Sequence, residues 1–223
     1  TLKFTLVINF VIVIVGEDNM VNLGRPVSLN RKNVSEACMY AYWSSGITNI
    51  SYNDVIKSSK LSKGSIYKLF NNEDDLQAET LTYYIKNANL LFEQISSNAE
   101  DLFQLMQMMN DYKFSNNMKY CYFMISYTER YKVGKKTRAN INKIANNVKK
   151  ILNDVIEKHF EKHCNKKNKI KTIKLSNYIF NTLTNITVLQ RNKVSKSEIN
   201  MYKESFYELI KNISYNKKYF IFN

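Results

Sequence analysis

The sequence predicts an all-α fold of about nine helices. The chain has five glycines and a single proline, Pro26, in 223 residues, so few residues interrupt helices. From residue 34 onward, apolar side chains recur at the spacings of three and four that place them on one helix face. Hydrophobic residues make up 44% of the chain, which is enough for a folded domain with a sizeable core.

The first predicted helix has one apolar stripe and a clear end. Its stripe comprises Val34, Ala37, Cys38, Ala41 and Tyr42. Gly46 follows, and glycine closes helices because it adopts the left-handed conformation without strain.

Two short helices follow, and each begins at a serine. Ser51 and Asp54 have the spacing of a capping box, which predicts that a helix starts at Ser51. Ser62 is a favourable N-cap for a second short helix over residues 63–70. The residues between them, 60–62, form the predicted turn.

Six longer helices complete the prediction. Three acidic residues, 73–75, favour a helix N-terminus. Residues 120–131 are apolar on nearly all sides, which is typical of a central helix, whereas 164–171 are polar and basic and predict a loop. The predicted helices span residues 73–95, 101–112, 120–131, 135–159, 173–189 and 196–213.

Two short helices joined by a tight turn and flanked by longer ones describe a helix-turn-helix, a DNA-binding unit. The second short helix would lie in the major groove. Gly64 and Ser65 at its start are small enough for close approach. Tyr67 supplies a hydroxyl for phosphate, while Lys63 and Lys68 supply charge.

Residues 50–70 closely resemble the helix-turn-helix of TetR-type regulators. The most specific part is Ser62-Lys63-Gly64-Ser65-Ile66-Tyr67, with Phe70 after it, and Gly24-Arg25-Pro26 resembles the start of such proteins. The resemblance covers about residues 24–95. It implies an all-helical homodimer in which three N-terminal helices bind DNA and a larger C-terminal domain binds a ligand and dimerises.

The resemblance also implies which residues contact DNA. Arg25 would reach the minor groove from an arm, whereas Ile66, Leu69 and Phe70 belong to the core. The implied DNA contacts are Arg25, Ser51, Lys60, Ser62, Lys63, Gly64, Ser65, Tyr67 and Lys68.

Two residues depart from the pattern of these regulators. Lys60 stands in the turn where glycine is usual, and a left-handed lysine costs about 1 kcal/mol relative to glycine. Glu73 stands where a phosphate-contacting lysine is usual, and its carboxylate would repel DNA unless it turns away.

The sequence divides into five segments. Residues 20–72 form the predicted DNA-binding domain, 73–95 a connecting helix, 96–215 the ligand-binding and dimerisation domain, and 216–223 a tail. The first 19 residues include an apolar run, 4–15, that is too short to span a bilayer as a helix. We expect 1–19 to lie upstream of a native start at Met20 or to be poorly ordered. A strand packed on the domain and a membrane anchor are the alternatives.

The net charge of +14 does not itself indicate DNA binding. Residues 20–95 contain 8 basic and 7 acidic residues, whereas 96–223 contain 24 and 10. The excess therefore lies outside the predicted DNA-binding segment. We interpret it as a solvated lysine-rich surface. Long-range attraction to a polyanion or to an anionic ligand is the alternative.

The C-terminal half is rich in aromatic residues and methionine. At helical spacing such residues form core, but the resemblance implies that some line a cavity for an apolar or aromatic inducer. The candidate ligand-binding residues are Phe103, Met106, Tyr122, Phe123, Tyr127 and Tyr178.

Cysteine and histidine usage predicts neither disulfides nor a metal site. Three distant cysteines fit a reducing cytoplasm, our predicted location. His159, His163 and Cys164 are close in sequence, but no fourth ligand is nearby, so we expect no metal. Cys121 is either a redox or electrophile sensor or a buried thiol.

No catalytic motif is present, so we expect neither an enzyme nor a cofactor. The sequence predicts a DNA-binding transcriptional regulator, a repressor that a small molecule releases from a palindromic operator. The alternative is a helical module that binds a partner or ligand without specific DNA binding. The sequence identifies neither the operator nor the inducer.

Overall fold

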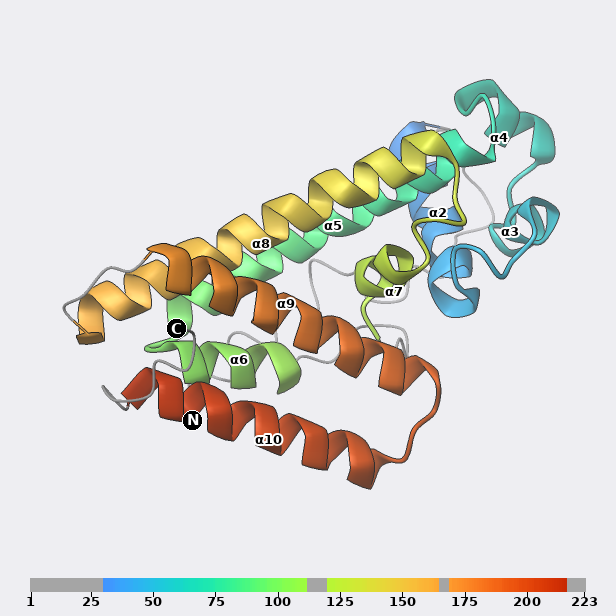
Figure 1. Cartoon of the computed structure of the whole chain (residues 1–223). Helices are drawn as coiled ribbons and strands as arrows, with labels where there is room; N and C mark the ends of the chain where they lie inside the picture. The colour runs from blue at the N-terminus through green and yellow to red at the C-terminus, as the bar shows by residue number, and fades with distance from the viewer. Residues whose placement is uncertain (1–29, 112–119, 165–168, 216–223) are drawn as a thin grey trace, which may run out of the picture.

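The computed structural model describes residues 30–111, 120–164 and 169–215. Within these ranges the chain forms nine helices and no strand, which confirms the predicted all-α fold (Figure 1). The helices are α2 (Arg31–Ser45), α3 (Tyr52–Ser58), α4 (Lys63–Leu69), α5 (Glu73–Asn98), α6 (Leu102–Asp111), α7 (Tyr122–Thr128), α8 (Lys135–Cys164), α9 (Lys169–Arg191) and α10 (Lys196–Tyr215).

Helices α2, α3 and α4 lie at one end of the molecule, against the start of α5 (Figure 1). Asn30 caps α2 by accepting a hydrogen bond from the Asn33 amide at 2.9 Å. Gly46 ends α2 with φ 95° and ψ 140°. The positive φ explains the glycine, although ψ differs from the left-handed helical value that we expected.

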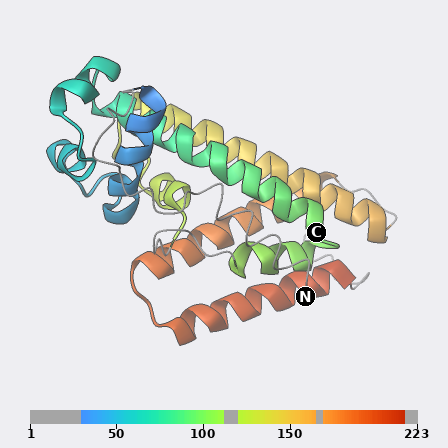
Figure 2. The ribbon, with the colours of Figure 1, turned by 180° about the vertical axis from the view of Figure 1, so that it is seen from behind.

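The long helices α5 and α8 lie side by side and run in the same direction, away from α4 (Figures 1 and 2). Helices α9 and α10 run back and forth below them, and α6 packs against α10. Helix α8 extends five residues past the predicted end at residue 159, and α9 begins at Lys169, so the predicted loop 164–171 is shorter than expected.

His159 is a core residue that joins α6 to α8. Its side chain is buried, and Nδ1 accepts a hydrogen bond from the backbone amide of Leu102 at 3.2 Å. The side chains of His163 and Cys164 lie outside the described residues. Among the side chains that are described, no group of three histidines, cysteines and carboxylates could hold a metal ion.

The predicted central helix is α7, which is shorter than the predicted 120–131. Tyr122, Phe123, Met124 and Ile125 are all buried, as its apolar sequence predicts. No helix in the described ranges is long and apolar enough to cross a membrane. The boundaries of the five segments stay a prediction, and residues 1–19, Arg25 and the tail 216–223 lie outside the described residues.

Asp74 caps helix α8 from another helix. Its carboxylate oxygens accept hydrogen bonds from the backbone amides of Lys136 at 2.9 Å and Thr137 at 2.8 Å. Gly134, which precedes α8, has no side chain with which to satisfy these amides. A Cβ atom on Gly134 would overlap the Asp74 carboxylate, so the glycine makes room for the cap.

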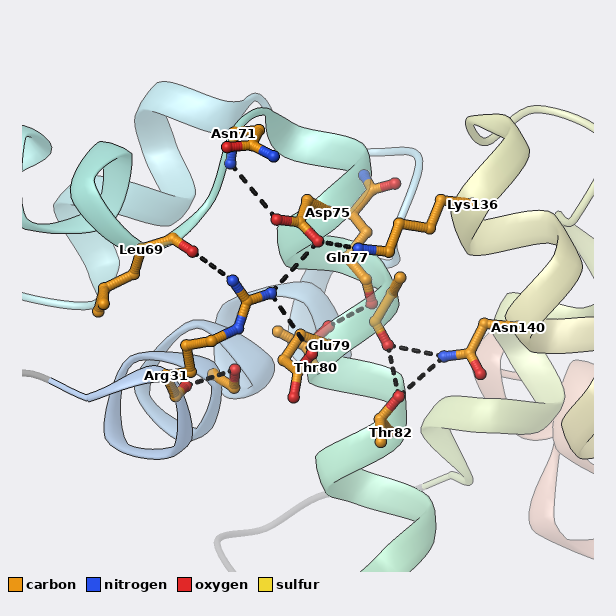
Figure 3. A network of polar contacts seen from close by, with 12 residues as sticks. Arg31, Leu69, Asn71, Asp75, Gln77, Glu79, Thr80, Thr82, Lys136 and Asn140 are labelled. Atoms are coloured by element: carbon orange, nitrogen blue, oxygen red, sulfur yellow. Dashed lines mark hydrogen bonds and ion pairs between the residues drawn. The ribbon is translucent and has the colours of Figure 1, made fainter.

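Asp75 holds two more elements beside α5 (Figure 3). Its Oδ1 is paired with Lys136 of α8 and lies 3.3 Å from the Arg31 guanidinium of α2. Arg31 also donates to the backbone carbonyl of Leu69 at the end of α4. Its guanidinium carbon lies 4.4 Å from the centre of the Phe70 ring. The start of α5 is therefore where α2, α4 and α8 meet.

The contact between Gly134 and Asp74 makes a prediction about stability. We expect Gly134→Ala to lower the free energy of unfolding by about 1–3 kcal/mol, because the new methyl group overlaps the Asp74 carboxylate. In an Asp74→Ala background the same change should cost much less. A double-mutant cycle by urea denaturation measures this coupling. Gly64→Ala is the matched control, since a Cβ there meets nothing within 4 Å. Equal costs in both backgrounds would contradict the contact.

The pKa values at the start of α5 predict acid sensitivity. Burial alone would raise the pKa of the Asp75 carboxyl, but the Lys136 ammonium, the Asn71 amide and Arg31 together lower it below 3.8. Because the pKa of Asp75 is lower in the folded protein than in the unfolded one, its ionised carboxylate stabilises the fold. This stabilisation is complete above the unfolded-state pKa, about 3.8, and is lost as the pH falls through the folded-state pKa.

We therefore expect the thermal midpoint of the natural sequence to fall more steeply below pH 4 than that of Asp75→Asn. The thermal midpoint of Asp75→Asn should be lower at pH 6 and should change less between pH 6 and pH 3. Differential scanning calorimetry from pH 6 to pH 3 measures both curves. Parallel curves would show that Asp75 contributes nothing to this dependence.

Candidate nucleic-acid interface

Helix α3 begins at Ser51, as predicted. Ser51 Oγ accepts a hydrogen bond from the Asp54 amide at 3.2 Å. Asp54 does reach back, but its carboxylate accepts from the Ser51 hydroxyl at 2.6 Å rather than from the backbone. The shorter aspartate side chain explains this difference from the usual capping box.

The turn between α3 and α4 contains Lys60 in the left-handed conformation, with φ 56°, which confirms the prediction for this residue. Ser59 stabilises the turn. Its hydroxyl donates to the Ile56 carbonyl at 2.7 Å and accepts from the Leu61 amide at 3.3 Å. The turn therefore forms without glycine, at the cost of a strained lysine.

Helix α4 begins at the predicted N-cap. Ser62 Oγ accepts a hydrogen bond from the Ser65 amide at 3.1 Å, and the two hydroxyls lie 2.6 Å apart. Ile66 and the following Phe70 are both fully buried. These two anchors, with the partly buried Leu69, fix the rotation of α4 and leave its opposite face exposed.

The outward face of α4 is basic, and a glycine leaves a gap between its side chains. Lys63, Gly64, Tyr67 and Lys68 are all exposed. The Tyr67 ring packs edge-on against Tyr52 of α3, with 5.6 Å between centroids. This contact holds the ring in place while 46% of the residue stays exposed. Beside it, a Cβ on Gly64 would meet no atom within 4 Å.

Most of the described candidate DNA contacts are exposed residues of α4 and of the segments that precede α3 and α4. Ser65 is half-buried, and Arg25 lies outside the described residues. The exposed candidates are Ser51, Lys60, Ser62, Lys63, Gly64, Tyr67 and Lys68. Sequence reasoning missed Lys57, which is exposed on α3 and lies 3.6 Å from Asp54. The i, i+3 spacing of Asp54 and Lys57 predicts this ion pair, but no sequence signal marks Lys57 as a DNA contact.

Glu73 turns away from this surface. Its carboxylate accepts hydrogen bonds from the Tyr42 hydroxyl at 3.3 Å and the Gln77 amide at 3.2 Å. Burial raises the pKa of Glu73 above its usual value, although both hydrogen bonds act in the opposite direction. The carboxylate that would repel a phosphate backbone is therefore directed into the protein.

A second candidate site is an apolar cavity of about 140 Å³ among α5, α6, α7, α8 and α9. Its lining comprises Tyr84, Ile85, Ala88, Asn89, Phe92, Ile95, Met109, Cys121, Phe123, Met124, Val148, Ile151, Leu152 and Leu183. Of the six residues expected to bind a ligand, Phe123 alone belongs to this lining.

The other five candidate ligand residues lie elsewhere. Tyr122 is buried with its hydroxyl 3.1 Å from Thr80 Oγ1, and Met106 is fully buried. The remaining three rings pack on aromatic neighbours: Phe103 on Tyr207, Tyr127 on Phe180, and Tyr178 on Phe206. Helical spacing identified these residues as apolar but did not separate core from cavity.

Cys121 lies in the cavity wall as a protonated thiol. Burial raises its pKa above the ordinary value, and the hydrogen bond from the Tyr84 hydroxyl, at 3.1 Å, only partly opposes this. Since the thiolate is the reactive form, the structure favours the buried-thiol interpretation over the sensor interpretation.

Several solved structures of similar shape are described as TetR-type regulators. A TetR-family transcriptional regulator from Cytophaga hutchinsonii matches with a TM-score of 0.71 and 14% identity, over 84% of this chain and 97% of that one. Reduced NemR of E. coli matches with a TM-score of 0.65 and 16% identity, over 82% and 96%. The TetR-family regulator CifR, solved with 26-bp operator DNA, matches with a TM-score of 0.64 and 12% identity, over 82% and 98%.

No protein-family model matches the chain, and no curated protein does. The likeness to the solved structures nevertheless covers more than four fifths of this chain. The chain therefore has the fold of TetR-type transcriptional regulators, as the resemblance of residues 50–70 predicts.

The left-handed conformation of Lys60 makes a prediction about stability. We expect Lys60→Gly to raise the free energy of unfolding by about 1 kcal/mol, because glycine adopts this φ without strain. The matched control is Lys57→Gly, which removes the same charge from within α3 and should cost about 1 kcal/mol. Chemical denaturation of both variants measures the difference. A loss of stability in Lys60→Gly would contradict the strained turn.

Proposed function

We propose that the chain is a DNA-binding transcriptional regulator that acts as a homodimer on a palindromic operator and is released by a small molecule. The observation that carries this proposal is the outward face of α4. This face presents Lys63, Tyr67 and Lys68 around a gap at Gly64.

The fold gives no reason for a glycine at residue 64. Its backbone is helical, and no atom of the described chain occupies the space that a side chain would fill. A glycine within a helix costs about 1 kcal/mol relative to alanine. An external surface that approaches the backbone of α4 accounts for it, and the edges of bases in the major groove are such a surface.

The charges on this face are also suited to DNA. Lys57, Lys60, Lys63 and Lys68 are exposed, and Glu73 is turned inward, so no carboxylate from the start of α5 opposes them. Lysines of this kind contact phosphates and position the protein, whereas the residues nearest the bases specify the sequence.

A homodimer would place two such faces on successive major grooves, roughly 34 Å apart. Exposed apolar residues on α10 support this arrangement. Met201 and Tyr202, one helical turn into α10, are 59% and 39% exposed. Because the interface of a twofold dimer uses the same patch on both subunits, one such surface per chain suffices.

The alternative, a module without specific DNA binding, is favoured by the near-neutral charge of residues 20–95, by Lys60 in place of glycine and by Glu73. Lys60 and Glu73 are both accommodated by the described structure, since the turn still forms and the carboxylate lies inside.

The proposal is tested by a salt titration of the full chain on DNA from around its own gene, with a scrambled duplex as the reference. We expect tight binding of two protomers to one palindromic fragment. Tyr67→Ala should weaken this binding by about 10-fold or more. Gly64→Leu should abolish it without loss of folding, because the added side chain meets open space in the free protein.

The matched control compares two lysines. Lys63→Ala should reduce the slope of log K against log salt by about one ion, since it removes one phosphate contact. Lys150→Ala removes the same charge from the exposed surface of α8 and should leave the slope unchanged. Equal, weak binding to every duplex, with the same loss in both variants, would instead indicate a nonspecific polycation.

A further inference from the structure

None of the described residues that line the apolar cavity is charged. Its described polar groups are the Asn89 amide, the Tyr84 hydroxyl and the Cys121 thiol. Burying an unpaired charge among such residues is very costly, whereas a neutral apolar molecule gains free energy by leaving water. The lining therefore selects a neutral ligand and disfavours acids and amines.

The cavity has room for about one ring. Its volume is about 140 Å³. An apolar cavity of about 150 Å³ in another protein stays free of water and binds benzene. Asn89 adds one group that both donates and accepts hydrogen bonds, so a single neutral polar substituent on the ring is accommodated.

One wall of the cavity touches the DNA-binding end directly. The Tyr84 ring packs edge-on against Trp43 of α2, with 5.0 Å between centroids. The Tyr84 hydroxyl donates a hydrogen bond to the Cys121 thiol. A molecule that displaces Tyr84 therefore displaces a ring on which α2 rests.

A second residue of the cavity wall, Cys121, is connected to Trp43 through its chain neighbour. Cys121 follows Tyr120, whose carbonyl accepts a hydrogen bond from Trp43 Nε1 at 2.6 Å. The Tyr120 hydroxyl donates to the carbonyls of Trp43 and Ser44 at 3.1 Å. These reciprocal hydrogen bonds clamp the end of α2 to the segment that leads into the cavity wall.

We propose that this cavity binds a neutral, apolar molecule of about one ring, and that its occupancy is transmitted to α2 through Tyr84, Trp43 and Tyr120. The ligand class follows from the lining alone. The consequence for DNA rests on the function proposed above: a shift of α2 moves α4, because Arg31 of α2 is bonded to the end of α4. A ligand acts in this way only by binding one arrangement of these residues better than another.

Trp43 is the only tryptophan in the chain, so its fluorescence reports on this path in the full protein without DNA. We use toluene as the probe, with benzoate and benzylammonium as charged molecules of similar size. Toluene should give a saturable change in Trp43 emission and a matching isotherm by calorimetry. The charged probes should bind at least tenfold more weakly.

Two variants fill the cavity and one serves as a control. Ala88→Phe and Val148→Phe each project a ring from the lining, and each should raise the dissociation constant for toluene at least tenfold. Asn146→Phe adds the same ring at an exposed position of α8 and should leave binding unchanged. Circular dichroism confirms that each variant is folded, and two filling variants guard against the failure of one.

The outcomes separate the parts of the proposal. Comparable binding of toluene and benzoate would overturn the ligand class. Toluene binding by calorimetry without any change in Trp43 emission would overturn the path to α2. Neither result depends on DNA, so failure here is distinct from failure of the salt titration, which tests the regulator function itself.

Discussion

Three consecutive carboxylates at the start of α5 hold the two halves of the molecule together. Glu73 accepts from Tyr42 of α2, Asp74 caps α8, and Asp75 pairs with Lys136 and with Arg31. Each carboxylate thus contacts a different helix or pair of helices. Because α4 ends just before this segment, its orientation depends on the same three residues.

The three carboxylates form contacts within the protein and do not face outward beside α4. A carboxylate facing DNA would oppose binding, but one that accepts backbone amides stabilises a helix N-terminus. Asp74 does this for a helix that follows it by about 60 residues in sequence, and Gly134 leaves the space that it needs. The acidic start of α5 is therefore compatible with a basic face on the neighbouring α4.

Trp43 of α2 connects the cavity wall with the end of the molecule that α2, α3 and α4 form. Its ring contacts Tyr84 in the cavity wall, and its indole donates to Tyr120 beside Cys121. The carboxylates at the start of α5 and these contacts of Trp43 are two separate connections between the halves. The first is formed by charged and polar groups, whereas the second combines hydrogen bonds between Trp43 and Tyr120 with the packing of the Tyr84 ring, which adjoins open space. Packing of this second kind is the easier to change by filling the cavity.

The sequence by itself determined the local elements. Ser51 and Ser62 begin their helices as predicted, and Lys60 adopts the left-handed conformation, because caps and turns depend on residues within four positions of one another. Only the tertiary structure decided that Asp74 caps α8 and which aromatic residues line a cavity rather than fill the core. These contacts join residues far apart in the chain, and periodicity reports which face of a helix is apolar but not what packs against it.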